Sequence, residues 1–133
     1  MTTDNARFRS GMRSFVTDLL DVEVVRDERD VVDEPDVAVV FVRGELDRTG
    51  VPWLAGCLRE VLNRGGPGGS VVLNLTGMTF VDVGGVRLLT EVTRWAAARS
   101  LRLYLAGCSA ELVRLLRLAD VLDEVDLIPT GPM

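Results

Sequence analysis

The pattern of apolar positions alternates along the chain between short strand-like runs and longer segments with helical spacing. Short runs rich in valine and leucine occur at 37–42, 71–75 and 101–105. The run 37–42 is unbroken, which is typical of a strand covered on both faces. Apolar residues recur every three or four positions in 53–62, 82–98 and 109–118, as in helices that bury one side. Strands and helices are therefore expected to alternate after residue 36.

This alternation predicts an α/β fold. We expect a single domain with a mixed sheet of four or five strands and with helices on at least one face. A short strand at 22–25 and a short helix or strand at 120–128 complete the expected elements. The 133 residues are enough to bury a core without help from a disulfide or a metal.

The first 21 residues are predicted to form a separate, helical extension. Phe8, Met12, Phe15 and Leu19 lie at helical spacing, which predicts a helix over 5–20. Residues 22–133 then form the domain. The extension is interpreted as a helix packed on this domain; the alternative is an arm that binds a partner or forms a homodimer.

Three residues are placed where they could cap the predicted helices. Thr49 is expected to cap the first of them, with Pro52 in its first turn. Asp82 and Ser109 are expected to cap the next two. The glycine-rich stretch 63–69 follows a helix and has no lysine, so it is interpreted as a connector rather than a phosphate loop.

Composition excludes much catalytic chemistry. The chain has no histidine, and all of its positive side chains are arginines. It therefore lacks an imidazole base, a histidine metal ligand and a lysine for a Schiff base or a phosphate loop. The net charge of −5 and the absence of a basic face argue against a nucleic-acid partner.

The two cysteines, Cys57 and Cys108, are interpreted as small buried hydrophobic residues. Their separation does not match metal-ligand spacing, so we expect no metal site and no cofactor. No stretch has the roughly 18 apolar residues that span a bilayer, and the N-terminus does not resemble a signal peptide. The expected location is the cytoplasm, with no membrane partner.

The junction at 82–85 is the most informative part of the chain. Gly84 and Gly85 leave the start of the predicted helix without side chains, so a partner's surface could approach the backbone closely. Further along, Arg87, Glu91 and Arg94 fall on the outer face of the helix, with Thr90 near its edge. This face is either a recognition surface or a ladder of solvated ion pairs. The apolar stripe expected to face the sheet consists of Gly85, Leu88, Leu89, Val92, Trp95 and Ala96.

Several stretches in order resemble the STAS domain, named for sulphate transporters and anti-sigma factor antagonists. Residues 40–47, VFVRGELD, with the following Thr49, resemble its "GELD…T" element. Residues 71–89 resemble its central motif, which ends in Asp-Ser-Ser-Gly before an apolar helix. The resemblance covers 37–128 and implies a small sheet with helices on one side.

In free-standing members of this family, the resemblance implies partner switching. The unmodified protein binds an anti-sigma factor, a serine kinase of the histidine-kinase-like ATPase type, and so releases a sigma factor. Phosphorylation of a serine in the central motif adds charge and breaks the complex. The resemblance implies a partner-binding surface formed by Asp47, Thr49, Asp82, Val83, Gly84, Gly85, Val86, Arg87, Thr90 and Glu91.

This chain departs from the family motif at the switch. Asp47 and Asp82 match the two acidic positions and Gly85 matches the motif glycine, but Val83 and Gly84 replace the two serines. Gly84 stands at the position of the phosphorylated serine, so we expect no phosphorylation there.

Three alternatives remain open at this stage. A hydroxyl of Thr76 or Thr79 could take over the phosphorylation. The domain could instead sense a nucleotide or another small ligand at the start of the 82–98 helix. A third hypothesis is an enzyme that uses Asp47 and Asp82 as acid and base, but without histidine, lysine or a recognisable metal site we expect the chain not to be an enzyme.

Overall fold

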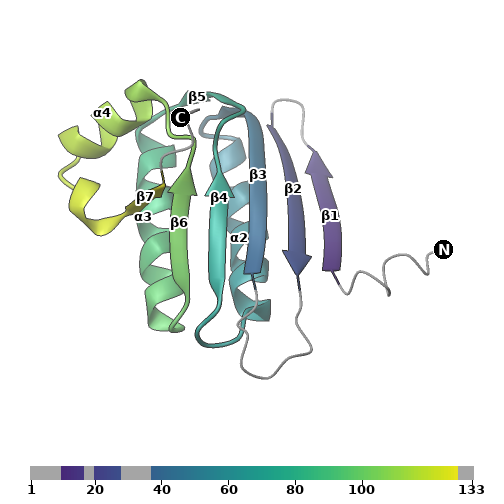
Figure 1. Cartoon of the computed structure of the whole chain (residues 1–133). Coiled ribbons are helices and arrows are strands. Elements are labelled where there is room, and N and C mark those ends of the chain that lie inside the picture. Colours follow the sequence, from purple (N-terminus) through teal and green to yellow (C-terminus); the bar gives the residue numbers. More distant parts are fainter. Residues whose placement is uncertain (1–9, 17–19, 28–36, 129–133) are drawn as a thin grey trace, which may run out of the picture.

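The computed structural model describes residues 10–16, 20–27 and 37–128, which form one mixed sheet with helices packed mainly on one face (Figure 1). The sheet has seven strands in the order β1-β2-β3-β4-β6-β7, and β5 pairs with β3. The strands are β1 Ser10–Val16, β2 Leu20–Asp27, β3 Val37–Leu46, β4 Ser70–Asn74, β5 Met78–Val81, β6 Arg102–Ala106 and β7 Asp126–Ile128. The predicted α/β class and mixed sheet are confirmed, but the sheet has seven strands rather than the expected four or five, because β1 and β5 also pair into it.

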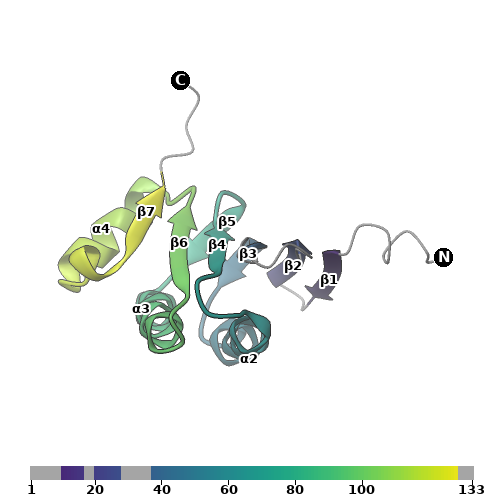
Figure 2. The same ribbon diagram turned by 60° about the horizontal axis from the view of Figure 1, so that its bottom comes forward.

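Helices α2 Gly50–Arg64 and α3 Val83–Ala98 lie side by side on one face of the sheet, as both views show (Figures 1 and 2). Helix α4 Ala110–Leu118 contacts α3 and lies beside β7 at the edge of the sheet (Figure 2). The core fills the space between the sheet and α2 and α3. Its fully buried side chains include Val22, Val40, Leu46, Leu54, Leu58, Leu73, Leu89 and Leu105.

The predicted N-terminal helix is wrong for the residues that the structure describes. Ser10–Val16 forms strand β1, which pairs antiparallel with β2 from Ser10 opposite Asp27 to Val16 opposite Asp21. This pairing provides hydrogen-bond partners for the backbone N–H and C=O groups on the outer edge of β2. These hydrogen bonds stabilise the strand more than the helical spacing of the apolar residues favours a helix. Residues 5–9 and 17–19 of the predicted helix lie outside the described residues.

The prediction that β3 is covered on both faces is also wrong. Ala38, Val40 and Val42 are buried, whereas Val39 and Phe41 are only half-buried. The burial alternates because α2 and α3 cover one face of the sheet.

The later part of the chain follows the sequence prediction closely. Ser109 caps α4, since its hydroxyl oxygen accepts a hydrogen bond from the backbone N–H of Leu112 at 3.1 Å. The segment predicted as a helix or a strand contains both, a short 3-10 turn Leu122–Glu124 and the edge strand β7. None of the helices in the described part of the chain is long and apolar enough to cross a membrane.

Candidate partner-binding site

The two acidic residues singled out in the sequence lie next to each other at one edge of the sheet. Strands β3 and β5 are parallel neighbours, and Leu46 pairs with Val81 at their ends. The next residues, Asp47 and Asp82, therefore leave the sheet side by side. Each leads into one of the two helices that cover the sheet, so the starts of α2 and α3 are adjacent.

Asp47, rather than Thr49, caps helix α2. The backbone N–H groups of Thr49 and Gly50 donate to Asp47 Oδ1 at 3.0 and 3.1 Å. Thr49 already has helical backbone angles and makes no side-chain cap hydrogen bond, so the predicted cap is wrong. An aspartate accepts hydrogen bonds from N–H groups two and three residues later, which makes it the stronger cap here.

Asp82 caps α3 as predicted. Its backbone is extended, and its Oδ1 accepts a hydrogen bond from the N–H of Gly85 at 3.1 Å. Its charge also lies at the positive end of the helix dipole, which adds about 0.3–1 kcal/mol of stability. The carboxylate thus occupies the helix start where the alternative hypothesis would place an anionic ligand.

The two glycines of the junction have different roles. A Cβ on Gly85 would lie 2.6 Å from Val81 Cγ2 and 3.0 Å from Leu46 Cδ2, so only glycine fits between the sheet and α3. A Cβ on Gly84 would lie 3.3 Å from Asp82 Oδ1 and 3.8 Å from Val51 Cγ2, so a side chain fits once the Asp82 carboxylate shifts by a few tenths of an ångström. The glycine at the family's phosphoserine position is therefore not required by packing.

Apolar side chains are exposed at this junction. Val83 is 66% exposed and Phe80, just before it on β5, is 49% exposed. Large exposed apolar side chains such as these are candidates for contact with another protein. Sequence analysis missed Phe80, although it lies in an apolar run directly before Asp82.

A hollow of about 390 Å³ is lined by residues of α3, including Val83, and by residues of the segment after α4. Val86 and Thr90 are buried, and the Thr90 hydroxyl donates to the Val86 carbonyl at 3.0 Å. These two predicted contact residues therefore lie within the hollow, and Gly85 is buried behind them. The hollow is lined by Val83, Val86, Arg87, Thr90, Glu91, Arg94, Ala119 and Val121. Ala119 and Val121, from the segment after α4, had no signal in the sequence.

The charged face of α3 does not form the ladder of ion pairs that was one of the two hypotheses. Arg94 pairs with Glu124 across to the 3-10 turn, with nitrogen–oxygen distances of 2.8 and 3.0 Å. Among the described residues, Arg87 and Glu91 have no ion-pair partner, and both are exposed. Two opposite charges are thus available beside the hollow.

The described residues contain no group of three or more histidine, cysteine or acidic side chains placed to hold a metal ion. Asp47 and Asp82 both accept hydrogen bonds from helix N–H groups, which accounts for their positions without an acid–base role.

The motifs and the fold agree with one family. The family model described as "Mlab, STAS domain" matches residues 30–129. This chain belongs to the STAS domain family. A search of curated protein sequences found no match.

Solved structures with the fold of this STAS domain include three antagonist structures. An anti-sigma factor antagonist from Mycobacterium paratuberculosis is 20% identical, with coverage of 82% of this chain and 86% of that chain and a TM-score of 0.63. The anti-sigma factor antagonist SpoIIAA in its unphosphorylated form is 15% identical, with coverage of 91% and 89% and a TM-score of 0.61. The Bacillus cell fate determinant SpoIIAA in its phosphorylated form is 14% identical, with coverage of 91% and 92% and a TM-score of 0.58. At these identities the comparison establishes the shared STAS fold.

Proposed function

We propose that this STAS domain is an anti-sigma factor antagonist-like protein that works by partner binding. It binds an anti-sigma factor of the serine-kinase, histidine-kinase-like ATPase type and so releases a sigma factor. The structural similarity to antagonists supports this proposal, as does the match of Asp47, Asp82 and Gly85 to the family motif.

The observation that carries the proposal is the exposed Val83, which lines an open hollow. Val83 is 66% exposed although it begins a helix that is otherwise packed on the core. The hollow beside it offers an apolar floor at Val86 and two unpaired charges at Arg87 and Glu91. An apolar centre with a charged rim is the usual composition of a protein–protein interface.

The complex is proposed to form without the family's serine switch. Gly84 has no hydroxyl to modify, and Asp82 lies directly beside it. The Thr79 hydroxyl is exposed but lies on β5, where it donates to the Gly44 carbonyl at 3.2 Å. We infer that the protein stays competent to bind and that its abundance, rather than phosphorylation, sets the amount of complex.

Affinity purification from the native cells, followed by calorimetry with the purified partner, tests this function. Val83→Glu is expected to weaken binding at least about tenfold, because a charge replaces an apolar contact at the centre of the surface. Leu118→Glu is the matched control, since Leu118 is 69% exposed and does not line the hollow. Equal binding by the two variants, or an eluate without an anti-sigma factor, would contradict the proposal.

A further inference from the structure

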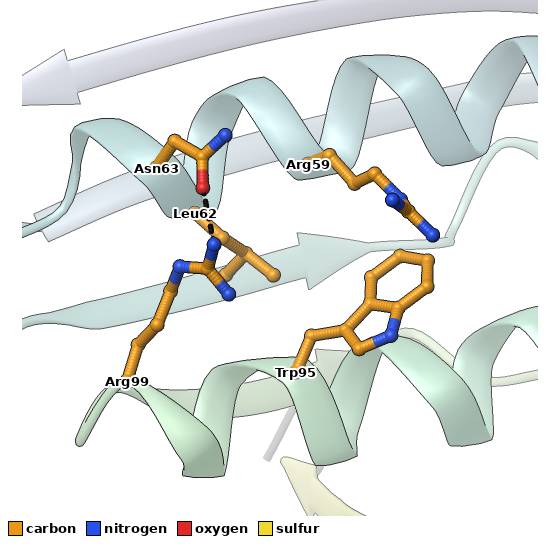
Figure 3. A pocket seen from close by; sticks show the side chains of 5 residues that line it. All are labelled: Arg59, Leu62, Asn63, Trp95 and Arg99. Atoms are coloured by element: carbon orange, nitrogen blue, oxygen red, sulfur yellow. Dashed lines mark hydrogen bonds between the residues drawn. The ribbon is translucent and has the colours of Figure 1, made fainter.

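A second hollow lies between α2 and α3, apart from the proposed partner-binding surface. It has a volume of about 120 Å³ and is lined by Arg59, Leu62, Asn63, Trp95 and Arg99. Figure 3 shows Arg59 and Asn63 on α2 facing Trp95 on α3 and Arg99, the residue directly after α3, across it. Trp95, predicted to face the sheet, lies at this groove and is only half-buried.

The two arginines of this hollow are held in place by neutral groups. The Arg59 guanidinium lies over the Trp95 ring, 4.3 Å from its centroid. Arg99 Nη2 donates to Asn63 Oδ1 at 2.5 Å (Figure 3). Neither contact neutralises a positive charge, so two oriented guanidinium groups face one small space.

No acidic side chain of these helices balances the two charges. The one acidic residue of α2, Glu60, pairs with Arg64 at 3.8 Å. The one acidic residue of α3, Glu91, lines the other hollow. Among the described residues, neither Arg59 nor Arg99 forms an ion pair with a carboxylate. Two uncompensated arginines on a chain of net charge −5 are a local reversal of its overall charge.

The charge of the hollow matches a dianion. The carbonyl ends of α2 and α3 lie nearby and contribute a partial negative charge of about one half each. Two guanidiniums exceed this contribution, so the hollow keeps a net positive charge. Guanidinium donors bind phosphate through paired hydrogen bonds, and a phosphate monoester carries about −1.5 to −2 charges near neutral pH.

The volume of the hollow is sufficient for a small anion. Its volume of about 120 Å³ is large enough to admit an ion of the size of phosphate. The hollow is open to solvent, so the rest of a phosphate ester can extend outside it. We propose that Arg59 and Arg99 form a binding site for a single phosphate group, either free or as the ester of a small molecule. This inference does not depend on the proposed binding of an anti-sigma factor.

Titration of the full chain, labelled with nitrogen-15, tests the site through the Nε–H signals of its arginines. Sodium phosphate replaces sodium chloride at constant ionic strength, with glycerol 3-phosphate as the ester probe. We expect saturable shifts of the Arg59 and Arg99 signals at millimolar phosphate. Tighter binding of the ester identifies an esterified phosphate as the ligand, and equal or tighter binding of inorganic phosphate identifies the free ion.

Matched variants separate a binding site from a purely structural contact between helices. Arg59→Gln and Arg99→Gln are each expected to weaken phosphate binding at least about tenfold. Arg117→Gln, an exposed arginine in the last turn of α4, is expected to bind as the wild type does. Absence of saturable shifts would overturn the proposal. So would unchanged phosphate affinity in Arg59→Gln and Arg99→Gln, even if their melting temperatures fall, because the arginines would then only join the helices.

Discussion

Asp47 and Asp82 follow paired residues of two adjacent parallel strands, and each caps the helix that it precedes. Leu46 pairs with Val81, and the carboxylates one residue later accept hydrogen bonds from the first N–H groups of α2 and α3. The same two residues match the acidic positions of the STAS motif. Their fixed orientation gives the proposed binding surface a rigid base, because both side chains are tied to the backbone.

Asp82→Ala is expected to lower the free energy of unfolding by about 1 kcal/mol, because the N–H of Gly85 loses its acceptor. Asp82→Asn keeps a side-chain oxygen at that place and should retain most of the stability. Urea unfolding of the three proteins measures the difference. If Asn and Ala destabilise equally, the carboxylate does not act as a cap.

The neighbouring glycines should differ in how strongly they respond to alanine. Gly85→Ala places a methyl group 2.6 Å from Val81 Cγ2, so we expect a loss of about 1–3 kcal/mol through overpacking. In Gly84→Ala the methyl group lies 3.3 Å from Asp82 Oδ1, so the carboxylate has to shift slightly; the gain in helix propensity offsets this, and we expect a change in stability of less than about 1 kcal/mol. Thermal unfolding of both variants checks this contrast, and a larger loss for Gly84→Ala would contradict it.

Cys108 is expected to be a poor nucleophile in the folded protein. Burial raises the pKa of its thiol from 9.0 to about 11. At pH 8 this lowers the thiolate fraction about a hundredfold relative to the unfolded chain, and alkylation slows accordingly. Rates with iodoacetamide, measured by mass spectrometry in buffer and in urea, test this expectation. Fast alkylation of Cys108 in the folded protein would show that it is not shielded.

The same shift gives a stability effect with a definite sign. The folded thiol has a higher pKa than the unfolded one, so its contribution to stability is fully present below about pH 9 and is lost as the pH rises toward about 11. Cys108→Ala should flatten this part of the pH profile. If Cys108→Ala loses stability as steeply as the wild type between about pH 9 and about pH 11, the pH dependence comes from other groups.

Much of the fold could be predicted from local sequence because local rules determine it. Asp82 and Ser109 were identified as caps since a short polar side chain before a periodic apolar segment meets the first free N–H groups. The glycine-rich stretch after α2 was identified as a connector because it interrupts both the helical and the strand-like spacing of apolar residues. The family motif added the sheet arrangement that such local signals do not specify.

The errors came from contacts between distant segments. Strand β1 has helix-like apolar spacing, and only its pairing with β2 makes it a strand. Strand β5 has four residues, including the exposed Thr79 and Phe80, so its apolar and polar residues do not alternate and the strand was not predicted. Trp95 fits an apolar stripe, yet α2 passes close enough to place Arg59 over its ring.

In the candidate site, too, the features with a local sequence signal were predicted and those that depend on distant contacts were not. The sequence placed Asp47, Asp82 and the two glycines at one junction, but it did not show that Val86 and Thr90 are buried. The pairing of Arg94 with Glu124, 30 residues later, depends on how the segment after α4 returns to α3. Such a contact has no local signal.

The central claim is that this STAS domain binds its partner without a serine switch. Gly84→Ser tests it, since a Cβ at this position needs only a small shift of the Asp82 carboxylate, and the folding of the variant is checked by its melting temperature. The anti-sigma kinase recovered with the wild type is incubated with each protein and ATP, and phosphate incorporation and binding are then measured together. We predict that the wild type stays unmodified and bound, whereas Gly84→Ser is phosphorylated and released. Phosphorylation of the wild type, with loss of the complex, would contradict the account.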